Sequence, residues 1–283
     1  MRRIVVIALF AVIFLAGLSL MLYPTISDSL SSRRQTQAVT EYFSVVEGLS
    51  EQDFSELFQA AHEYNEGLHR NPNRFIMTDE ENAHYRRLLN PLETGIIGTL
   101  EIDVIDVHLP IYHGTDTGVL RIGLGHMEGT SLPVGGPGTH TVITGHRGLP
   151  SATLLTHLDS MAIGDLFHVH VLDATLTYRV DQIMIVLPHE TGELALIPDA
   201  DYCTLVTCTP YGLNTHRLLV RGRRVQESIP DFETPDMPAF IPPGARILNG
   251  TRAALLLVLP ALIVIATLLF IKLRRIYGKG EER

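Results

Sequence analysis

Two long apolar runs without a charged residue lie near the ends of the chain, at residues 4–22 and 253–271. Each run has nineteen residues, and a helix of that length, rising about 1.5 Å per residue, spans nearly all of the ~30 Å hydrocarbon core of a membrane. Basic residues lie on the outer side of both runs, with Arg2 and Arg3 before the first and Lys272 and two arginines after the second. The positive-inside rule therefore places both termini in the cytoplasm and everything between the runs outside.

We accordingly predict a multi-pass membrane protein with two transmembrane helices. Residues 1–23 are the N-terminal anchor, and residues 252–283 are a C-terminal helix followed by a basic cytoplasmic tail. The alternative for the first run is a cleaved signal peptide, but the apolar region of such a peptide is usually shorter, and no clear Ala-x-Ala site follows Leu22. An uncleaved anchor is therefore the expectation.

After the first run, the spacing of apolar positions is helical. Residues 36–70 carry apolar side chains three or four positions apart, which predicts one or two helices. A turn that contains proline follows. Thr78 and Glu81 then have the spacing of a capping box, which predicts a short helix through Leu89. Residues 24–94 are therefore a helical N-terminal extension.

From Gly95 onward, short runs rich in β-branched residues alternate with turns that contain Gly, Pro, Asp or Asn. The predicted strands are Ile96–Ile102, Val107–Tyr112, His140–Thr144, Phe167–Leu172, Leu176–Val186, Tyr202–Thr207 and Arg217–Val225. Strands at this spacing indicate a mainly β domain, either a barrel or a sandwich, over residues 95–226. One short helix, Ser151 to Leu158, is expected to interrupt the strands. The Pro-rich residues 227–251 are expected to form an extended linker to the second apolar run.

Charge excludes one class of function. The net charge is −9, and no basic stripe is present that could neutralise nucleic-acid phosphates. The only two lysines, Lys272 and Lys279, lie in the C-terminal tail, so every permanent cation before that tail is an arginine.

Cys203 and Cys208 are the only two cysteines. In an exported protein, such a pair suggests a disulfide. If both lie on one strand, however, five residues at ~3.3 Å each separate them by ~16 Å and place them on opposite faces. A disulfide needs Cα atoms within ~7 Å of each other, so we expect two free thiols, one of which is a candidate nucleophile.

Three residues at strand ends are candidates for chemistry. Cys208 ends its strand and enters a polar loop, whereas Cys203 lies in mid-strand, where a lone cysteine is usually inert core packing. His146 ends an apolar strand at the rim, where functional side chains tend to lie. If the last two predicted strands form a hairpin, Arg217 folds back beside Cys208, where its charge would favour a thiolate or stabilise an oxyanion.

Each candidate also has a structural reading. The chain has thirteen histidines, so any one of them is more often structural than catalytic. Arg217 read alone is a solvated residue at the start of a strand. A zinc site built from His140, His146 and Cys208 is a further alternative, although its spacing matches no common ligand pattern. On spacing alone, these alternatives stay open.

The same segments resemble the sortase family. Thr204-Leu-Val-Thr-Cys208 is similar to the active-site strand of that family, with an arginine nine residues later, and Thr144-Gly-His146 is similar to its histidine strand. Further motifs resemble class C sortases, the pilus-polymerising branch: Leu109-Pro-Ile-Tyr-His-Gly-Thr115, Gly125-His-Met-Glu-Gly-Thr-Ser-Leu-Pro-Val-Gly-Gly136, His146-Arg-Gly-Leu-Pro150 and Cys208-Thr-Pro-Tyr-Gly212. The likeness runs from about Gly95 to Val225.

The resemblance implies a closed sortase-type β-barrel and a set of catalytic roles. Cys208 would be the nucleophile, His146 the general acid and base, and Arg217 the residue that stabilises the oxyanion or the thiolate. The implied reaction cleaves a Leu-Pro-x-Thr-Gly-like sorting signal between Thr and Gly through a thioester and transfers the acyl group to a lysine amine of a pilin subunit. The implied partners are sorting-signal proteins and the lipid bilayer, without a cofactor, a metal or nucleic acid.

One feature of class C sortases differs here. These enzymes often carry an N-terminal lid with an Asp-Pro-aromatic motif over the cysteine, and the nearest segment in this chain, Asn71-Pro-Asn-Arg-Phe75, lacks the Asp. We expect a lid within residues 70–91 but assign no residue that covers Cys208. Three alternatives to a pilus enzyme stay open: a housekeeping sortase that uses the amine of a cell-wall precursor, a cysteine protease that releases the thioester to water, and a non-enzymatic membrane scaffold.

Overall fold

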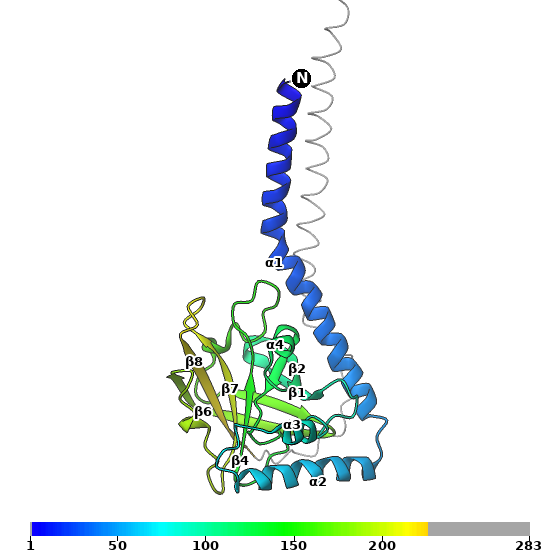
Figure 1. The fold of residues 1–283 in the computed structure, drawn as a ribbon, viewed down its shortest axis with the longest axis vertical. Coiled ribbons are helices and arrows are strands. Elements are labelled where there is room, and N and C mark those ends of the chain that lie inside the picture. Colours follow the sequence, from blue (N-terminus) through cyan, green and yellow to red (C-terminus); the bar gives the residue numbers. More distant parts are fainter. Residues whose placement is uncertain (1, 226–283) are drawn as a thin grey trace, which may run out of the picture. The chain divides into compact units, whose positions relative to one another are not determined.

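The computed structural model describes residues 2–225 (Figure 1). The first element is α1, Arg2–Val46, a single helix of 45 residues that joins the first apolar run to the start of the extension. It continues through Pro24, beyond the predicted membrane segment. Among the described residues, this is the one helix whose length and apolar composition suffice to cross a membrane. The predicted linker and the second predicted transmembrane helix lie outside the described residues.

Two further helices complete the N-terminal extension. α2, Glu51–Leu68, begins with a capping box that was not predicted from the sequence. α3, Asp79–Tyr85, begins with the predicted capping box of Thr78 and Glu81. It ends four residues before the predicted end at Leu89, which adopts a φ of 50° outside the right-handed helical region.

Eight strands form a closed barrel, with the neighbour order β1-β2-β3-β4-β7-β8-β6-β5. The strands are β1 Ile96–Ile102, β2 Val107–His113, β3 Leu124–His126, β4 Thr139–Thr144, β5 Leu166–Val171, β6 Ala174–Val186, β7 Asp201–Thr209 and β8 His216–Arg224. The predicted mainly β fold with a closed barrel is therefore confirmed, and a sandwich is excluded.

The segments between the strands depart from the sequence-based expectation at two places. β3 and the short helix α4, Thr117–Ile122, were not predicted. The helix predicted over Ser151 to Leu158 is wrong, because the chain forms turns there and only a short 3-10 helix, η2, follows at Leu158–Ser160. The Thr153 N–H and hydroxyl both donate to the Asp28 carboxylate of α1, at 2.7 and 2.9 Å. Leu154, inside the predicted helix, adopts a φ of 42°, and a right-handed helix does not accommodate this left-handed backbone conformation.

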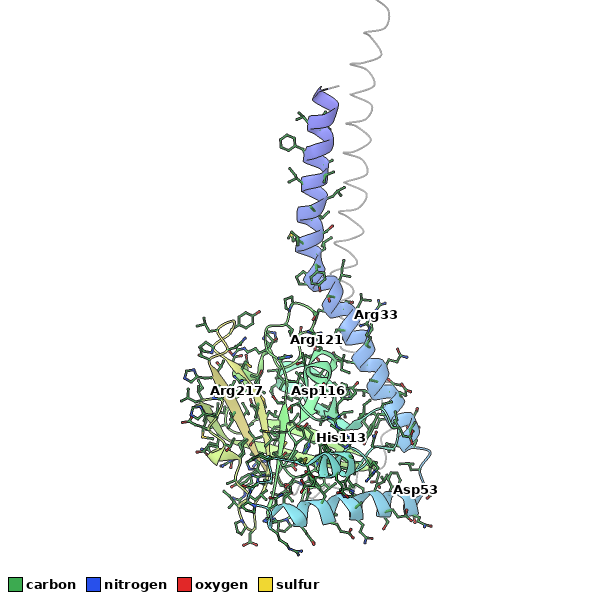
Figure 2. All side chains as sticks on the ribbon, in the orientation of Figure 1. Arg33, Asp53, His113, Asp116, Arg121 and Arg217 are labelled. Carbon is green, nitrogen blue, oxygen red and sulfur yellow. The ribbon has the colours of Figure 1, made fainter. Side chains whose placement is uncertain are left out.

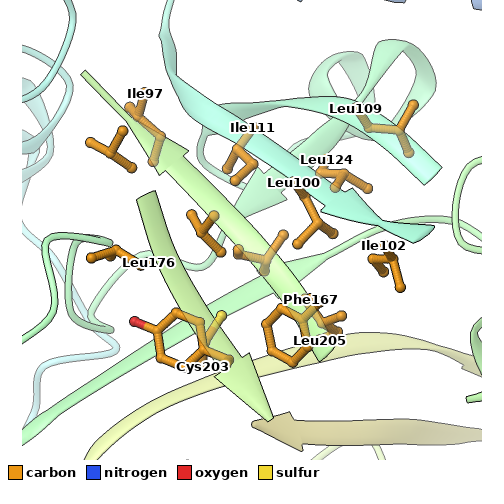
Figure 3. Packing of buried hydrophobic residues seen from close by; sticks show 14 of the residues in the cluster. Ile97, Leu100, Ile102, Leu109, Ile111, Leu124, Phe167, Leu176, Cys203 and Leu205 are labelled. Atoms are coloured by element: carbon orange, nitrogen blue, oxygen red, sulfur yellow. The ribbon is translucent and has the colours of Figure 1, made fainter. Parts of the chain in front are cut away.

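Alternate positions of the strands fill the barrel with apolar side chains, among them Leu100, Ile111, Phe167 and Leu205 (Figure 3). α1 contributes to the same core through Tyr42, which is fully buried. The Tyr42 hydroxyl donates to the Ile97 carbonyl at 3.4 Å and accepts from the Leu172 N–H at 2.7 Å. The helix that carries the apolar run is therefore packed onto the barrel by its C-terminal part.

Candidate active site

Three neighbouring strands, β4, β7 and β8, bring the three candidate residues to the same level of the barrel. In the antiparallel pair of β7 and β8, Cys208 lies directly opposite Arg217, which confirms the predicted hairpin. In the parallel pair of β4 and β7, Thr144 lies opposite Val206. His146 and Cys208 each lie two residues further along the chain. His146 therefore follows the end of β4 and lies beside the end of β7. Figure 2 labels Arg217 on β8.

Backbone contacts fix the spacing between the histidine and cysteine strands. The Gly145 N–H donates to the Val206 carbonyl at 3.0 Å. The Thr207 hydroxyl donates to the Gly145 carbonyl at 2.8 Å, and Thr207 is buried. Because side chains alternate along a strand, Thr207 points to the interior and Cys208 to the outer face. The residues that precede His146 and Cys208 are thus tied to each other directly.

The two cysteines lie in opposite environments, and both are free thiols. Cys203 is fully buried in the barrel core, and burial raises the pKa of its thiol well above the usual value. Cys208 is only partly buried. The prediction of two free thiols, with Cys203 in the core and Cys208 partly exposed, is confirmed, while the inertness of Cys203 stays a prediction.

A cavity of about 290 Å³ opens on the outer face of these strands, and His146, Cys208 and Arg217 all line it. Its apolar part belongs to a second cluster of hydrophobic side chains, separate from the barrel core, that we call the outer cluster: Met127, Val142, Met184, Val186, Leu194, Val206 and Leu219. A polar end with the three candidate residues and an apolar floor along the strands suit an extended peptide that has one reacting carbonyl.

Electrostatics at this end of the cavity favour a neutral histidine. Burial lowers the pKa of His146, and the positive charge of Arg121 lowers it further. The Arg217 guanidinium donates to the carbonyls of Asn214 and His216, at 3.3 and 3.1 Å, which orients it from its own hairpin. Within residues 2–225, Arg217 forms no ion pair with a carboxylate, and no hydrogen bond joins the three candidate side chains.

His140 has a structural role, and it is therefore not available as a ligand for the alternative zinc site. Its Nδ1 lies 3.0 Å from the Ala195 carbonyl oxygen, and its Nε2 lies 2.7 Å from the Thr204 hydroxyl oxygen. Burial lowers the pKa of His140 to about 4. Both ring nitrogens are engaged in a buried network, and neither is free to bind a metal together with His146 and Cys208.

One wall of the cavity was not anticipated from the sequence. It comes from the loop between β6 and β7, which contributes five residues to the lining: Leu187, Pro188, Glu190, Thr191 and Leu194. The only signal in the sequence was that two long strands enclose a segment without strand spacing. The length of this loop, and its position directly before the strand that carries Cys208, are the features that could have indicated a role in the site.

Comparison with known proteins identifies this arrangement. A family model described as the sortase domain matches residues 100–225. Sortase D of Bacillus subtilis is 30% identical over 137 residues, and the match covers 47% of this chain and 66%, just under two thirds, of that relative.

Solved structures give a closer match. The crystal structure of sortase C1 from Streptococcus agalactiae is 44% identical, with a TM-score of 0.64, over 67% of this chain and 98% of that chain. Sortase C of Streptococcus pneumoniae is 42% identical, with a TM-score of 0.60, over 67% of this chain and 96% of that one. A lid mutant of sortase A from Corynebacterium diphtheriae is 44% identical, with a TM-score of 0.60, over 64% of this chain and 98% of that one.

Proposed function

Because this chain belongs to the sortase family of cysteine transpeptidases, which act on sorting-signal proteins, we propose that it is a class C, pilus-polymerising sortase. In this proposal it cleaves a Leu-Pro-x-Thr-Gly-like signal between Thr and Gly and joins the threonine carbonyl to a lysine amine of a pilin subunit. The observation that carries the proposal is the outer-face cavity in which Cys208, His146 and Arg217 meet at one end of an apolar groove.

The neighbours in structure support the pilus class. Several of the solved structures that it resembles at about 40% identity or more are C-type sortases, and the Streptococcus pneumoniae enzyme among them is described in connection with pilin substrate specificity. The motifs on either side of the three site residues resemble the same class. The helical extension before the barrel is a further feature in common.

The first half-reaction forms a thioester. The Cys208 thiol gives its proton to His146, and the sulfur attacks the threonine carbonyl of the sorting signal. The guanidinium of Arg217, directly across the hairpin, stabilises the negative oxygen of the tetrahedral intermediate. When the intermediate collapses, the Thr–Gly bond breaks, and His146 protonates the departing glycine amine.

The second half-reaction consumes the thioester. A lysine amine of the next pilin attacks the same carbonyl, while His146 accepts the proton that the amine loses. The bond between carbon and sulfur breaks, an isopeptide bond remains, and the Cys208 sulfur regains a proton. The lowered pKa of His146 suits this step, because a neutral imidazole is the form that accepts a proton.

The N-terminal apolar helix suggests that the enzyme is anchored to the membrane, with its sortase domain outside the cytoplasm. We further propose that residues 252–283 contribute a second transmembrane helix and that both termini are cytoplasmic. This topology can be tested by fusing a reporter after residue 283 that is active only in the cytoplasm. An inactive reporter would place the C-terminus outside and reject the two-helix arrangement.

A peptide assay tests the proposed activity and separates it from its alternatives. The soluble ectodomain is incubated with a Leu-Pro-x-Thr-Gly peptide and with one of two amines, a lysine peptide from a pilin or a peptidoglycan stem peptide. A pilus sortase prefers the lysine peptide, a housekeeping enzyme prefers the stem peptide, and a protease releases only hydrolysed product. A scaffold would give no turnover, and Cys208→Ala would then leave the cellular phenotype unchanged.

A further inference from the structure

Arg74 lies in the N-terminal extension and contacts two loops that are far from it in the sequence. Its two terminal guanidinium nitrogens donate to the carbonyl oxygens of Gly129 and Leu194, at 2.6 and 2.7 Å. The side chain is half-buried, and burial lowers the pKa of the guanidinium. Desolvation of a cation is costly unless hydrogen bonds compensate, so these two contacts are what makes the position favourable for an arginine.

Both acceptors belong to loops that bound the cavity described above. Leu194 ends a short 3-10 helix in the β6–β7 loop and lies in the outer cluster. Gly129 is two residues after Met127, which lines the same cavity. One side chain therefore connects two loops that both contribute residues to the cavity wall.

The backbone next to Arg74 also packs closely against Gly129. A methyl group added at Gly129 would clash with the Arg74 carbonyl oxygen, and Gly129 has a φ of +78°, in the region that favours glycine. The Arg74 guanidinium in turn lies 4.3 Å above the Phe75 ring. The contact is thus formed by backbone packing and by a charged side chain together.

The distance from the cysteine shows which part of a substrate this contact can affect. Leu194 packs with Val142 and Leu219, and these residues are at the levels of Thr204 and Val206 on β7, which are four and two residues from Cys208. At about 3.3 Å per residue this is ~7–13 Å. An extended peptide has the same rise per residue, so a sorting signal that runs along β7 from Cys208 would have the residues two to four positions from its scissile bond beside Leu194.

We propose that Arg74 is a positioning residue that holds the β3–β4 and β6–β7 loops at the spacing needed to recognise the first residues of the sorting signal. This role rests on the proposed function. Arg74 does not line the cavity around Cys208, and neither does any other residue of 70–91 in the described chain. Arg74 affects the reaction only through the two loops that form the cavity wall. The expected lid within residues 70–91 stays a prediction.

Arginine is suited to this role because its planar fork presents two nitrogens to two acceptors at once. Lysine carries the same charge as a single ammonium at the end of a flexible chain. Arg70 offers a matched control, since it lies four residues away in the same segment, is exposed, and has no side-chain partner in the described chain. Arg70→Ala removes the same side chain and the same charge without touching either loop.

The experiment compares wild type, Arg74→Ala, Arg74→Lys and Arg70→Ala in the full-length protein, solubilised in detergent. Steady-state kinetics use two peptides that differ only at the first position of the signal, Leu-Pro-x-Thr-Gly and Ala-Pro-x-Thr-Gly. For Arg74→Ala we expect kcat/KM on the leucine peptide to fall about tenfold, mainly through KM, which equals the loss of ~1.4 kcal/mol and is close to one hydrogen bond to a charged group. The preference for leucine over alanine should fall with it, and lysine should restore part of both.

Two further measurements do not depend on turnover. Hydrogen exchange of the amides of residues 187–195 should become faster in Arg74→Ala than in Arg70→Ala, because the loop loses an anchor. The rate of alkylation of Cys208 should stay within about twofold of wild type, because the cysteine end of the cavity is unchanged. Gly129→Ala, which displaces the same backbone without removing the guanidinium, should give the same loop exchange and the same loss of preference.

The outcomes separate the two proposals. If wild type does not cleave the peptide, the proposed function fails, while loop exchange still tests the contact of Arg74. Unchanged KM, unchanged preference and unchanged loop exchange in a normally folded Arg74→Ala would overturn the positioning role. A fall in kcat alone would also overturn it. Alkylation of Cys208 that is many times faster in Arg74→Ala would identify the segment as a lid instead.

Discussion

Selective modification of the two cysteines is the most direct test of the site, and its size follows from burial. Cys203 is fully buried in the barrel core, so a reagent can reach it only when the barrel opens. An opening free energy of about 5 kcal/mol, the lower end of ordinary domain stability, corresponds to an open population of about 10⁻⁴. The raised pKa of the Cys203 thiol reduces its reactivity further.

Cys208 needs no opening, because it lines the cavity and is partly accessible. We therefore expect Cys208 in the native ectodomain to be modified by a small alkylating reagent at least ~10³-fold faster than Cys203. The assay follows the mass of the intact protein over time and locates the label by peptide mapping. In denaturant both cysteines should react at similar rates, and this sets the scale for the native measurement.

Two variants control the assignment. Cys208→Ala should remove the fast phase and leave only the slow one, and Cys203→Ala should keep the fast phase and thioester formation. Comparable native rates at the two positions, or a fast phase that survives in Cys208→Ala, would refute the reasoning from burial and with it the choice of nucleophile.

Three further predictions concern neighbouring residues. Arg217→Lys should lower kcat by on the order of 10²-fold in steady-state assays, because lysine keeps the charge but loses the planar fork, and a near-normal kcat would contradict its role at the oxyanion. Arg121→Gln should raise the pKa of His146, because it removes a positive charge that disfavours the imidazolium. The limb of the pH–rate profile that reports His146 should therefore move to higher pH, and an unchanged limb would count against this coupling. Tyr42→Phe should reduce the free energy of unfolding by about 1–3 kcal/mol in urea melts, because the buried Leu172 N–H loses its acceptor, and a loss well below ~1 kcal/mol would mean that this contact does not hold the helix.

The sequence predicted the barrel strands well, because their spacing and turn residues are local signals. Both ends of seven strands were predicted to within two residues of their observed limits, and only β3, with three residues, was not predicted. The hairpin of β7 and β8 was also predictable, since a short loop joins consecutive strands. It was enough to place Arg217 opposite Cys208 without any knowledge of a family.

The position of His146 beside Cys208 could not be obtained in the same way. β4 and β7 are parallel neighbours separated by two intervening strands in the sequence, and residue spacing does not reveal such a pairing. Only the resemblance to sortases brought the two residues together before the structure did. Pairings over long sequence separations are decided by the whole fold.

The role of the N-terminal extension was the least accessible to sequence reasoning. Arg74 binds two backbone carbonyls, and a carbonyl is present at every position, so no partner residue signals the contact. The length of the first helix was equally hard to predict from the sequence, because a proline usually suggests that a helix breaks. Here α1 continues past Pro24, and its later part packs on the barrel through Tyr42.

The tie between Thr207 and Gly145 has a practical consequence for trapping a substrate. The separation of the cysteine and histidine is set one residue earlier on each strand, by a hydroxyl and an amide that bind backbone carbonyls, and no hydrogen bond between the two reactive side chains supports it within the described chain. An inactive protein with Cys208→Ala should therefore hold an uncleaved sorting signal in the geometry of the working enzyme. The strands around the site would keep their spacing without the cysteine sulfur. Complexes captured with that variant would therefore show how the scissile carbonyl approaches the site in the working enzyme.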